Sequence, residues 1–219
     1  MKEKSRNLIV RGAGGHAMVV AEAAALQQSP SRIVFMAPER SPIRFPSGVD
    51  CIFVNAEIPD ATFDRNEWAF VSAIGDCHAR AKVHAELLDA GFSPASIVHP
   101  GAIVSESATI GAGSVALSGS TIQAGCWLGE GVIINNNASI DHDCRIGSFT
   151  HICPGATLAG NVTVGEKSMV GTGASVVPGR SLGAGCVLGA GAVLVDVDCP
   201  DGAVFVGIPA RNLESREQI

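Results

Sequence analysis

The chain has 219 residues, of which 47% are hydrophobic and 26 are glycine, while tyrosine is absent. This composition provides apolar material for a core of small and aliphatic side chains, within one large domain or two small ones. With a net charge of −6, the chain lacks the basic surface that nucleic acids and anionic membranes require, so we expect neither as a partner.

The cysteines and the N-terminal segment both favour a cytoplasmic protein. The seven cysteines are odd in number and form no C-x-x-C pair, which favours reduced thiols. The apolar stretch after Leu8 is interrupted by Arg11, His16 and Glu22. It therefore predicts neither a signal peptide nor a membrane span.

Residues 1–95 alternate between predicted strands and predicted helices. Short β-branched or aromatic runs predict strands at 8–10, 33–35, 51–54 and 68–74. Helix-forming stretches cover 16–28 and 77–90, with Gly91 well placed to end the second. Asp76, His78 and Arg80 fit ordinary positions around the start of that helix. The alternation predicts an α/β domain with a small, mostly parallel, Rossmann-like sheet.

The first predicted strand leads into the glycine-rich loop Gly12-Ala13-Gly14-Gly15-His16-Ala17. The spacing G-x-G-x-x-A between a strand and a helix directs backbone N–H groups at phosphate. A dinucleotide site would also need an acidic residue at the end of the second strand. Met36-Ala37-Pro38 follow that strand and Glu39 is poorly placed, so the loop favours a phosphate-bearing ligand other than NAD.

From residue 97 an aliphatic residue recurs every six positions. Of the 17 positions in this series, 16 are Ile, Leu or Val, and the exception is Ala116. A strict period of six is the hexapeptide-repeat signature of a parallel β-helix, and three hexapeptides per coil give its left-handed form. We expect this β-helix over 97–195 and a C-terminal tail, 196–219, that covers its end.

The position four residues after each aliphatic residue is usually small, which suits an inward slot near a corner of the coil. Cys126, Cys144 and Cys186 fall on this position. A buried cysteine packs as a compact hydrophobic side chain, so the period accounts for these three residues without chemistry.

The segment Asn135-Asn136-Asn137-Ala138-Ser139-Ile140-Asp141-His142-Asp143 gathers polar side chains inside this apolar tract. His142 comes two positions after Ile140, at a corner, and should face outward. One coil of 18 residues further on lies Gly160, which should stack beside it. A histidine next to a carboxylate is the minimal general-base arrangement. The alternative is an exposed histidine and two aspartates that only solvate a corner.

A second histidine, His151, follows His142 by nine residues, which is half a coil. The two side chains should therefore lie on opposite sides of one β-helix. Two copies of the chain could bring them to one substrate, if β-helices pack side by side about a threefold axis. We expect a homotrimer with active sites between subunits.

Four segments in this order resemble a known family: GAGGHAMVV, IDHDCRIGSFTH, GATLAGNVTVG and VFVGIPAR. The chain resembles, over nearly its whole length, the bacterial left-handed β-helix sugar acetyltransferases that carry an N-terminal nucleotide-binding α/β domain. The family includes sialic-acid O-acetyltransferases. It also includes N-acetyltransferases of nucleotide-linked 4-amino-4,6-dideoxy sugars, such as perosamine and bacillosamine precursors, which serve lipopolysaccharide or glycan biosynthesis.

The resemblance implies a role for each matching residue. It makes His142 the catalytic base and Asp143 the acidic residue that orients it. It places Asn135 and His151 near the acceptor and the thioester, and Gly14, Gly15 and His16 near the sugar nucleotide. It assigns acetyl-CoA contacts to Gly160, whose N–H meets the thioester carbonyl, and to Gly165 and the loop near Thr172. The chain lacks the aspartates that the family carries after the second strand, so UDP, GDP and dTDP stay open as the carrier.

The resemblance and the residue types together predict an acetyl-CoA-dependent N-acetyltransferase without a bound metal. O-acetylation of sialic acid or of another sugar hydroxyl is the first alternative. A zinc hydratase of the same fold is another, although it needs a third ligand besides His142 and His151. A non-catalytic sugar-nucleotide binder or assembly scaffold also stays open.

Overall fold

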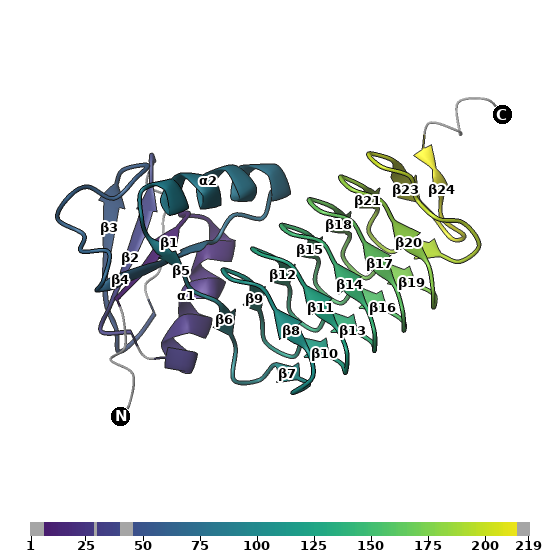
Figure 1. The fold of residues 1–219 in the computed structure, drawn as a ribbon, viewed down its shortest axis with the longest axis horizontal. Coiled ribbons are helices and arrows are strands. Elements are labelled where there is room, and N and C mark those ends of the chain that lie inside the picture. Colours follow the sequence, from purple (N-terminus) through teal and green to yellow (C-terminus); the bar gives the residue numbers. More distant parts are fainter. Residues whose placement is uncertain (1–6, 29, 40–45, 214–219) are drawn as a thin grey trace. The chain divides into compact units, whose positions relative to one another are not determined.

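The structure is a computed structural model, and it describes residues 7–28, 30–39 and 46–213. The chain divides into two compact units, Met1–Pro100 and Gly101–Ile219. The first unit carries a parallel sheet with two helices, and the second is a left-handed parallel β-helix (Figure 1). Both parts of the predicted fold are confirmed.

The first unit contains β1 (Asn7–Arg11), α1 (Gly15–Gln28), β2 (Arg32–Ala37), β3 (Asp50–Asn55), β4 (Trp68–Ser72), α2 (Cys77–Asp89), β5 (Ser93–Pro94) and β6 (Ile97–Val98). Its sheet has the order β3-β2-β1-β4-β5, and every pair in it is parallel. The chain moves outward from β1 to β2 and β3, and then returns to place β4 on the other side of β1. The strand order therefore reverses between β1 and β4, where open parallel sheets bind their ligands.

Two glycines and one aspartate set the limits of the elements in this unit. Asp76 caps α2 by accepting a hydrogen bond from the Ala79 N–H at 2.7 Å, and Gly91 follows the helix with a φ of 87°. The strand predicted at 68–74 ends earlier, at Ser72. The Ala73 N–H still donates to the Arg11 carbonyl oxygen at 2.9 Å, and a Cβ at Gly12 would lie 2.7 Å from the Ala73 carbonyl oxygen, so the chain after β4 packs closely against the glycine-rich loop.

As far as β22, the second unit consists of two-residue strands that repeat every six residues. After β6 these are β7 (Ile103–Val104), β8 (Thr109–Ile110), β9 (Val115–Ala116), β10 (Thr121–Ile122), β11 (Trp127–Leu128), β12 (Ile133–Ile134), β13 (Ser139–Ile140), β14 (Arg145–Ile146), β15 (His151–Ile152), β16 (Thr157–Leu158), β17 (Thr163–Val164), β18 (Met169–Val170), β19 (Ser175–Val176), β20 (Ser181–Leu182), β21 (Val187–Leu188) and β22 (Val193–Leu194). Each strand ends on the residue that the six-residue series identified.

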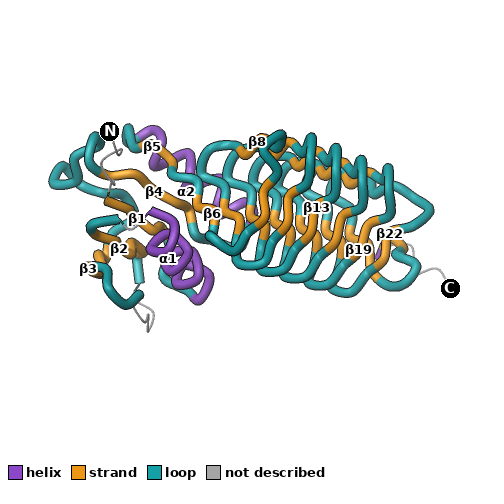
Figure 2. Tube along the Cα trace, turned by 90° about the horizontal axis from the view of Figure 1, so that it is seen from below, coloured by secondary structure: helices purple, strands orange, loops and turns teal. Residues whose placement is uncertain are grey.

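Strands pair with the strand 18 residues away, so three hexapeptides make one coil (Figure 2). The strands form three sheets, which we name by their first strand in this unit: the β7 sheet (β7-β10-β13-β16-β19-β22), the β8 sheet (β8-β11-β14-β17-β20) and the β9 sheet (β9-β12-β15-β18-β21-β23-β24). The last two strands of the β9 sheet are β23 (Val204–Val206) and β24 (Arg211–Asn212).

The aliphatic residue of each strand fills the interior of the coils. From Ala116 to Leu194 every member of the series is buried, and Ile140, Ile146 and Ile152 are fully buried. The first residue of each strand points the opposite way, toward the outer surface. This register runs unbroken through the polar segment 135–143. The outward side chains of that segment are therefore not needed to pack the interior, and they can serve binding or catalysis.

Candidate active site

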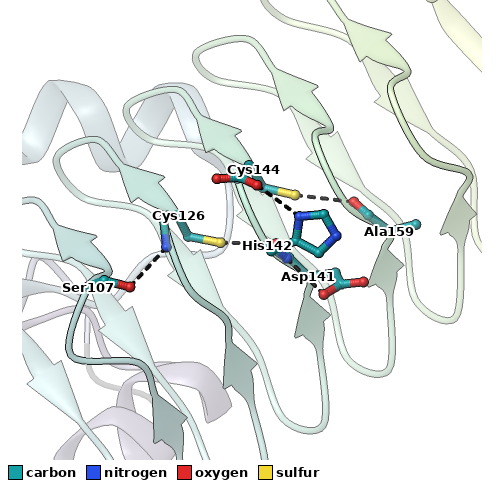
Figure 3. Close-up of polar contacts among 8 residues, drawn as sticks. Ser107, Cys126, Asp141, His142, Cys144 and Ala159 are labelled. Atoms are coloured by element: carbon teal, nitrogen blue, oxygen red, sulfur yellow. Dashed lines mark hydrogen bonds and ion pairs between the residues drawn. The ribbon is translucent and has the colours of Figure 1, made fainter.

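His142 lies in the turn between β13 and β14, at the corner where the β7 sheet meets the β8 sheet (Figure 3). Its Nδ1 atom is 2.9 Å from the Asp143 Oδ2 atom, and its backbone N–H donates to the Asp141 Oδ1 atom at 2.8 Å. The side chains of His142 and Asp143 are 60% and 67% exposed, so both can reach a ligand from solvent. Asp143 adopts a φ of 60°, a left-handed conformation that aspartate tolerates better than most residues.

The carboxylates around His142 change its protonation. The hydrogen bond to Asp143 raises the pKa of His142 above its ordinary value, and the charge of Asp141 adds to this effect. When the neutral ring donates its Nδ1 proton to Asp143, the Nε2 atom keeps its lone pair and can accept a proton. This arrangement can therefore act as a general base.

Both neighbours of the pair along the β-helix are glycines. A Cβ at Gly160, one coil after His142, would lie 2.5 Å from the Nε2 atom and 2.6 Å from the Cε1 atom. A Cβ at Gly125, one coil before Asp143, would lie 2.6 Å from its Oδ1 atom. The 18-residue step thus placed Gly160 correctly beside the imidazole, and the glycine is what makes room for the ring.

The backbone N–H of Gly160 makes no hydrogen bond within the part of the chain that the structure describes. The equivalent N–H one coil earlier, at His142, is taken by the Asp141 side chain. The equivalent residue one coil later is Pro178, which has no N–H. Ala159 stands where Asp141 stands one coil earlier, and its methyl group offers no acceptor. Gly160 therefore presents an open donor next to the Nε2 atom of His142.

Asn135 and His151 form a second polar pair, on the β9 sheet. The Asn135 Nδ2 atom is 3.0 Å from the His151 Nε2 atom, and the Asn136 N–H donates to the Asn135 Oδ1 atom at 2.8 Å. His151 is buried, with 8% of its surface exposed. Asn137 adopts a φ of 56° and acts as a turn residue.

The structure does not bring the two pairs together within one chain. His151 belongs to β15 in the β9 sheet, whereas His142 lies at the corner between the other two sheets. The half-coil spacing thus puts the two histidines on opposite sides of the β-helix, as the sequence predicted.

The glycine-rich loop joins β1 to α1 in the first unit. Gly14 and Gly15 are exposed, and a Cβ at either position would meet nothing within 4 Å. His16 is the second residue of α1 and is half-buried. The exposed start of a helix, preceded by glycines, is suited to bind phosphate.

The loop after β4 lies at the same edge of the sheet as the glycine-rich loop. Arg80 is buried and donates from its Nη1 atom to the carbonyl oxygens of Ile74 at 2.8 Å and Gly75 at 3.1 Å. Asp76 caps the helix and His78 is exposed, as expected of residues at a helix start. Arg80 therefore holds the backbone of the loop after β4 in place from the buried side.

The structure places Gly165 and Thr172 at other turns of the β-helix. A Cβ at Gly165 would collide with the backbone of Gly183 and Ala184 in the next coil, so coil stacking alone requires glycine there. Thr172 is exposed, and its carbonyl oxygen accepts from the Gly191 N–H at 2.9 Å.

The sequence did not indicate that the buried thiols near His142 donate hydrogen bonds. The Cys126 Sγ atom donates to the Asp141 carbonyl oxygen at 3.0 Å, and the Cys144 Sγ atom donates to the Ala159 carbonyl oxygen at 3.2 Å (Figure 3). Both thiols occupy the inward slot, as expected, but they are more than hydrophobic filling. One feature of the sequence could have indicated these bonds: cysteines occupy the inward slot in two successive coils, next to the polar segment.

Among the residues that the structure describes, no group of three or more His, Cys, Asp or Glu side chains lies where it could hold a metal ion. In the same residues, neither helix has the length and apolar character needed to cross a membrane.

Residues 7–87 match the PglD N-terminal domain family, and residues 125–160 match the bacterial transferase hexapeptide family. The acetyltransferase domain of PglB from Neisseria gonorrhoeae FA1090 is 39% identical with a TM-score of 0.87, and the match covers 95% of this chain and 100% of that chain. The same domain in complex with acetyl coenzyme A is 38% identical, with a TM-score of 0.86 and coverages of 95% and 99%.

PerB from Caulobacter crescentus, solved in complex with CoA and GDP-perosamine, is 35% identical with a TM-score of 0.80, and the match covers 94% of this chain and 96% of that chain. A comparison of the sequence with curated proteins gives no match. The fold, the two family matches and these similarities over nearly the whole chain agree. The chain therefore belongs to the left-handed β-helix sugar acetyltransferases that have an N-terminal domain of the PglD type.

Proposed function

We propose that the chain transfers the acetyl group of acetyl-CoA to the amine of a nucleotide-linked 4-amino-4,6-dideoxy sugar, with His142 as the general base. One observation carries the proposal. The His142 Nδ1 atom is held by Asp143 at 2.9 Å, which leaves the Nε2 atom beside the open N–H of Gly160. A base and an oxyanion donor side by side are what direct acyl transfer requires.

In the first step the sugar amine attacks the thioester carbonyl of acetyl-CoA, and the His142 Nε2 atom takes the proton that the nitrogen loses. Asp143 holds the ring and stabilises the imidazolium that forms. The Gly160 N–H donates to the oxygen of the tetrahedral intermediate as its negative charge develops. No acyl-enzyme is needed, because both substrates react directly.

In the second step the intermediate collapses and the C–S bond breaks. The imidazolium of His142 returns its proton to the leaving CoA thiolate, which restores the neutral base. A cysteine nucleophile plays no part in this mechanism. Burial raises the pKa of Cys126 and brings that of Cys144 to about 11, so both thiols stay protonated near neutral pH.

The acceptor's nucleotide is proposed to bind at the carboxyl edge of the first unit's sheet. The strand order reverses between β1 and β4, and the loops that follow these two strands meet there. Gly14, Gly15 and the start of α1 offer N–H groups and open space to the phosphates. His16 follows these glycines in the chain and is proposed to approach the sugar nucleotide. The complex of PerB with GDP-perosamine supports an acceptor of this chemical class.

The acetyl-CoA arm is proposed to follow the β-helix from Gly160 toward later coils, near Gly165 and Thr172. The structure of the PglB domain in complex with acetyl coenzyme A supports acetyl-CoA as the donor. All seven cysteines are free thiols, which agrees with the cytoplasm as the place where the chain acts.

The active enzyme is proposed to be a homotrimer whose sites combine His142 of one copy with Asn135 and His151 of another. The outward column that contains His151 continues with Met169, Val187 and Val204, all apolar and half-buried. In the coils around β15 to β21, the equivalent positions of the β7 and β8 sheets include the small polar residues Thr157, Ser175, Thr163 and Ser181, whereas Ile103 and Trp127 are exposed at these positions in earlier coils. An apolar face beside one half of a site favours contact with another copy at that face.

Mixed trimers test the shared site directly. When the inactive variants His142→Ala and His151→Ala are coexpressed in equal amounts, a shared site should be intact in about one quarter of cases, because each half comes from a random copy. We expect about that fraction of wild-type activity from the mixture. Activity no higher than that of the separate variants would show that each site is built from one chain.

A screen of acceptors tests the proposed reaction. Acetyl-CoA consumption is measured with UDP-, GDP- and dTDP-linked 4-amino-4,6-dideoxy sugars, with the matching 4-hydroxy sugars and free sialic acid as controls. We expect turnover with an amino sugar and none with its hydroxy counterpart. Turnover with sialic acid alone would make the chain an O-acetyltransferase, and the absence of turnover with every acceptor would contradict the proposal. Zinc analysis of the same sample tests the hydratase alternative, which requires a stoichiometric metal.

A further inference from the structure

Two buried thiols lie one above the other in the interior, behind the corner that carries His142. Cys126 and Cys144 are 18 residues apart, occupy the inward slot of successive coils, and are 1% and 0% exposed. Their acceptors are backbone carbonyls 15 residues further on: Asp141 for Cys126 and Ala159 for Cys144. Each acceptor immediately precedes a residue of the proposed site, namely His142 and Gly160.

A peptide group links each carbonyl to the N–H of the next residue. The group is planar and trans, so its C=O and N–H point in opposite directions. The Ala159 carbonyl points inward to the Cys144 thiol, and the Gly160 N–H of the same peptide must therefore point outward. The neighbouring coil confirms this rule, because the Asp141 carbonyl points inward to Cys126 while the His142 N–H reaches the exposed Asp141 carboxylate.

We propose that Cys144 is a positioning residue, whose thiol holds the peptide between Ala159 and Gly160 in the orientation that aims the Gly160 N–H at the thioester oxygen. The proposal rests on the proposed function, because it assigns a role to the donor of that reaction. The thiol acts in two ways. It fixes the rotation of the peptide plane, and its hydrogen bond to the carbonyl polarises the N–H at the other end of the same group.

The same kind of hydrogen bond, from an inward side chain to a backbone carbonyl further along the chain, recurs elsewhere in the β-helix. The hydroxyls of Ser114, Thr150 and Ser168 donate to the carbonyls of Gly129, Gly165 and Gly183, each 15 residues further on, at 2.7–3.0 Å. Cys186 donates to the Pro200 carbonyl at 2.7 Å. A serine in the slot can therefore make the same bond, and a contact of the same kind exists away from the proposed site.

Valine also fits these slots, without a donor. Val162 occupies the position one coil after Cys144, and Val132 occupies the column that contains Cys186. Cys144→Val therefore removes the hydrogen bond while filling the space, Cys144→Ser restores a donor, and Cys186→Val is the matched control for a buried thiol in the same kind of slot.

Steady-state kinetics separate positioning from packing. Acetyl-CoA consumption is followed by the loss of thioester absorbance, which does not count the protein's own thiols. We expect Cys144→Val to lower kcat about tenfold, less than the roughly 10²–10³-fold loss when an oxyanion donor is removed altogether. KM for acetyl-CoA should change less than about twofold, Cys144→Ser should recover most of kcat, and Cys186→Val should match the wild type. Equal kcat values for Cys144→Val and Cys186→Val would overturn the proposal.

A second measurement needs no turnover. In protein labelled with ¹⁵N-glycine, the Gly160 amide resonance is identified by its loss in Gly160→Ala. We expect this resonance to shift and its hydrogen exchange to change in Cys144→Val, to return toward the wild type in Cys144→Ser, and to stay unchanged in Cys186→Val. An unchanged resonance in Cys144→Val would overturn the role of Cys144, whereas a wild-type protein that is inactive with every acceptor would contradict only the proposed function.

Discussion

The two units of the chain offer their candidate binding groups in different ways. At the sheet edge of the first unit the exposed groups are mainly backbone N–H groups of Gly14 and Gly15, held at the start of α1. At the corner of the β-helix they are side chains, His142 and Asp143, whose position follows from an interior register that does not vary. The first arrangement suits recognition of a phosphate of any nucleotide, and the second suits one chemical step. Substitutions in the two units should therefore change different kinetic constants.

The largest expected effect breaks the register on which the corner depends. Ile146→Asp buries an unpaired charge at a fully buried position, which should lower the free energy of unfolding by more than about 4 kcal/mol. The neighbouring residue of β14, Arg145, is exposed, so Arg145→Asp is the matched control and should stay folded. Thermal unfolding followed by circular dichroism measures both variants. A cooperatively folded Ile146→Asp protein would refute the inward register.

Loss of the proposed general base should lower turnover and leave the stability unchanged. His142→Ala is expected to lower kcat by about 10²–10⁴, the range for removing a general base, without lowering the unfolding temperature, because the side chain is exposed. Initial rates at saturating substrates give kcat, and a thermal melt gives the stability. A variant that retains near-normal kcat would end the assignment of His142.

A charge at the glycine-rich loop should affect acceptor binding and spare the chemical step. Gly15→Asp introduces a carboxylate at the first residue of α1, where a Cβ meets nothing within 4 Å. We expect KM for the nucleotide sugar to rise at least about tenfold by repulsion of the phosphates, with kcat changed less than about threefold. Gly15→Ser, similar in size but neutral, is the control. A Gly15→Asp effect confined to kcat would contradict the division between the units.

The smallest effect concerns pH. Because Asp143 raises the pKa of His142, the base remains protonated, and inactive, up to a higher pH than an isolated histidine would. Asp143→Asn removes that carboxylate, so the pKa of His142 should fall and the acid limb of kcat/KM should move to lower pH. The substrate amine must also be neutral to attack, so its ionisation acts on the same acid side and should keep its pKa in the variant. An acid limb that does not move would show that Asp143 does not control the base.

The β-helix could be predicted almost completely because its rule is local and strict. A residue that must fill the interior every six positions leaves a direct trace in the sequence, and the step of 18 then locates spatial neighbours such as His142 and Gly160. The first unit obeys weaker rules. The strand predicted through Ile74 ends at Ser72, and Ala73 packs closely against Gly12, a tertiary contact that the local sequence does not indicate.

The candidate site was predictable in its side chains and in Gly160, but not in the buried contacts that orient its peptide groups. The sequence pointed to His142, Asp143 and the half-coil offset of His151, since these follow from residue type and spacing. The resemblance also pointed to the N–H of Gly160. The sequence did not point to the thiol bonds of Cys126 and Cys144. Such bonds depend on the direction in which a peptide group faces, and the identity of the residue does not determine that direction.

The 18-residue coil also constrains how such a chain can change over evolutionary time. A single inserted residue that is not looped out at a turn would shift every later aliphatic side chain out of the six-residue register, whereas duplication or deletion of one whole coil keeps the register. Each such event moves everything beyond it by about 4.8 Å along the axis. The β-helix therefore changes length in discrete steps, and events outside the coils of His142 and Gly160 lengthen or shorten the enzyme while preserving the corner that carries these two residues.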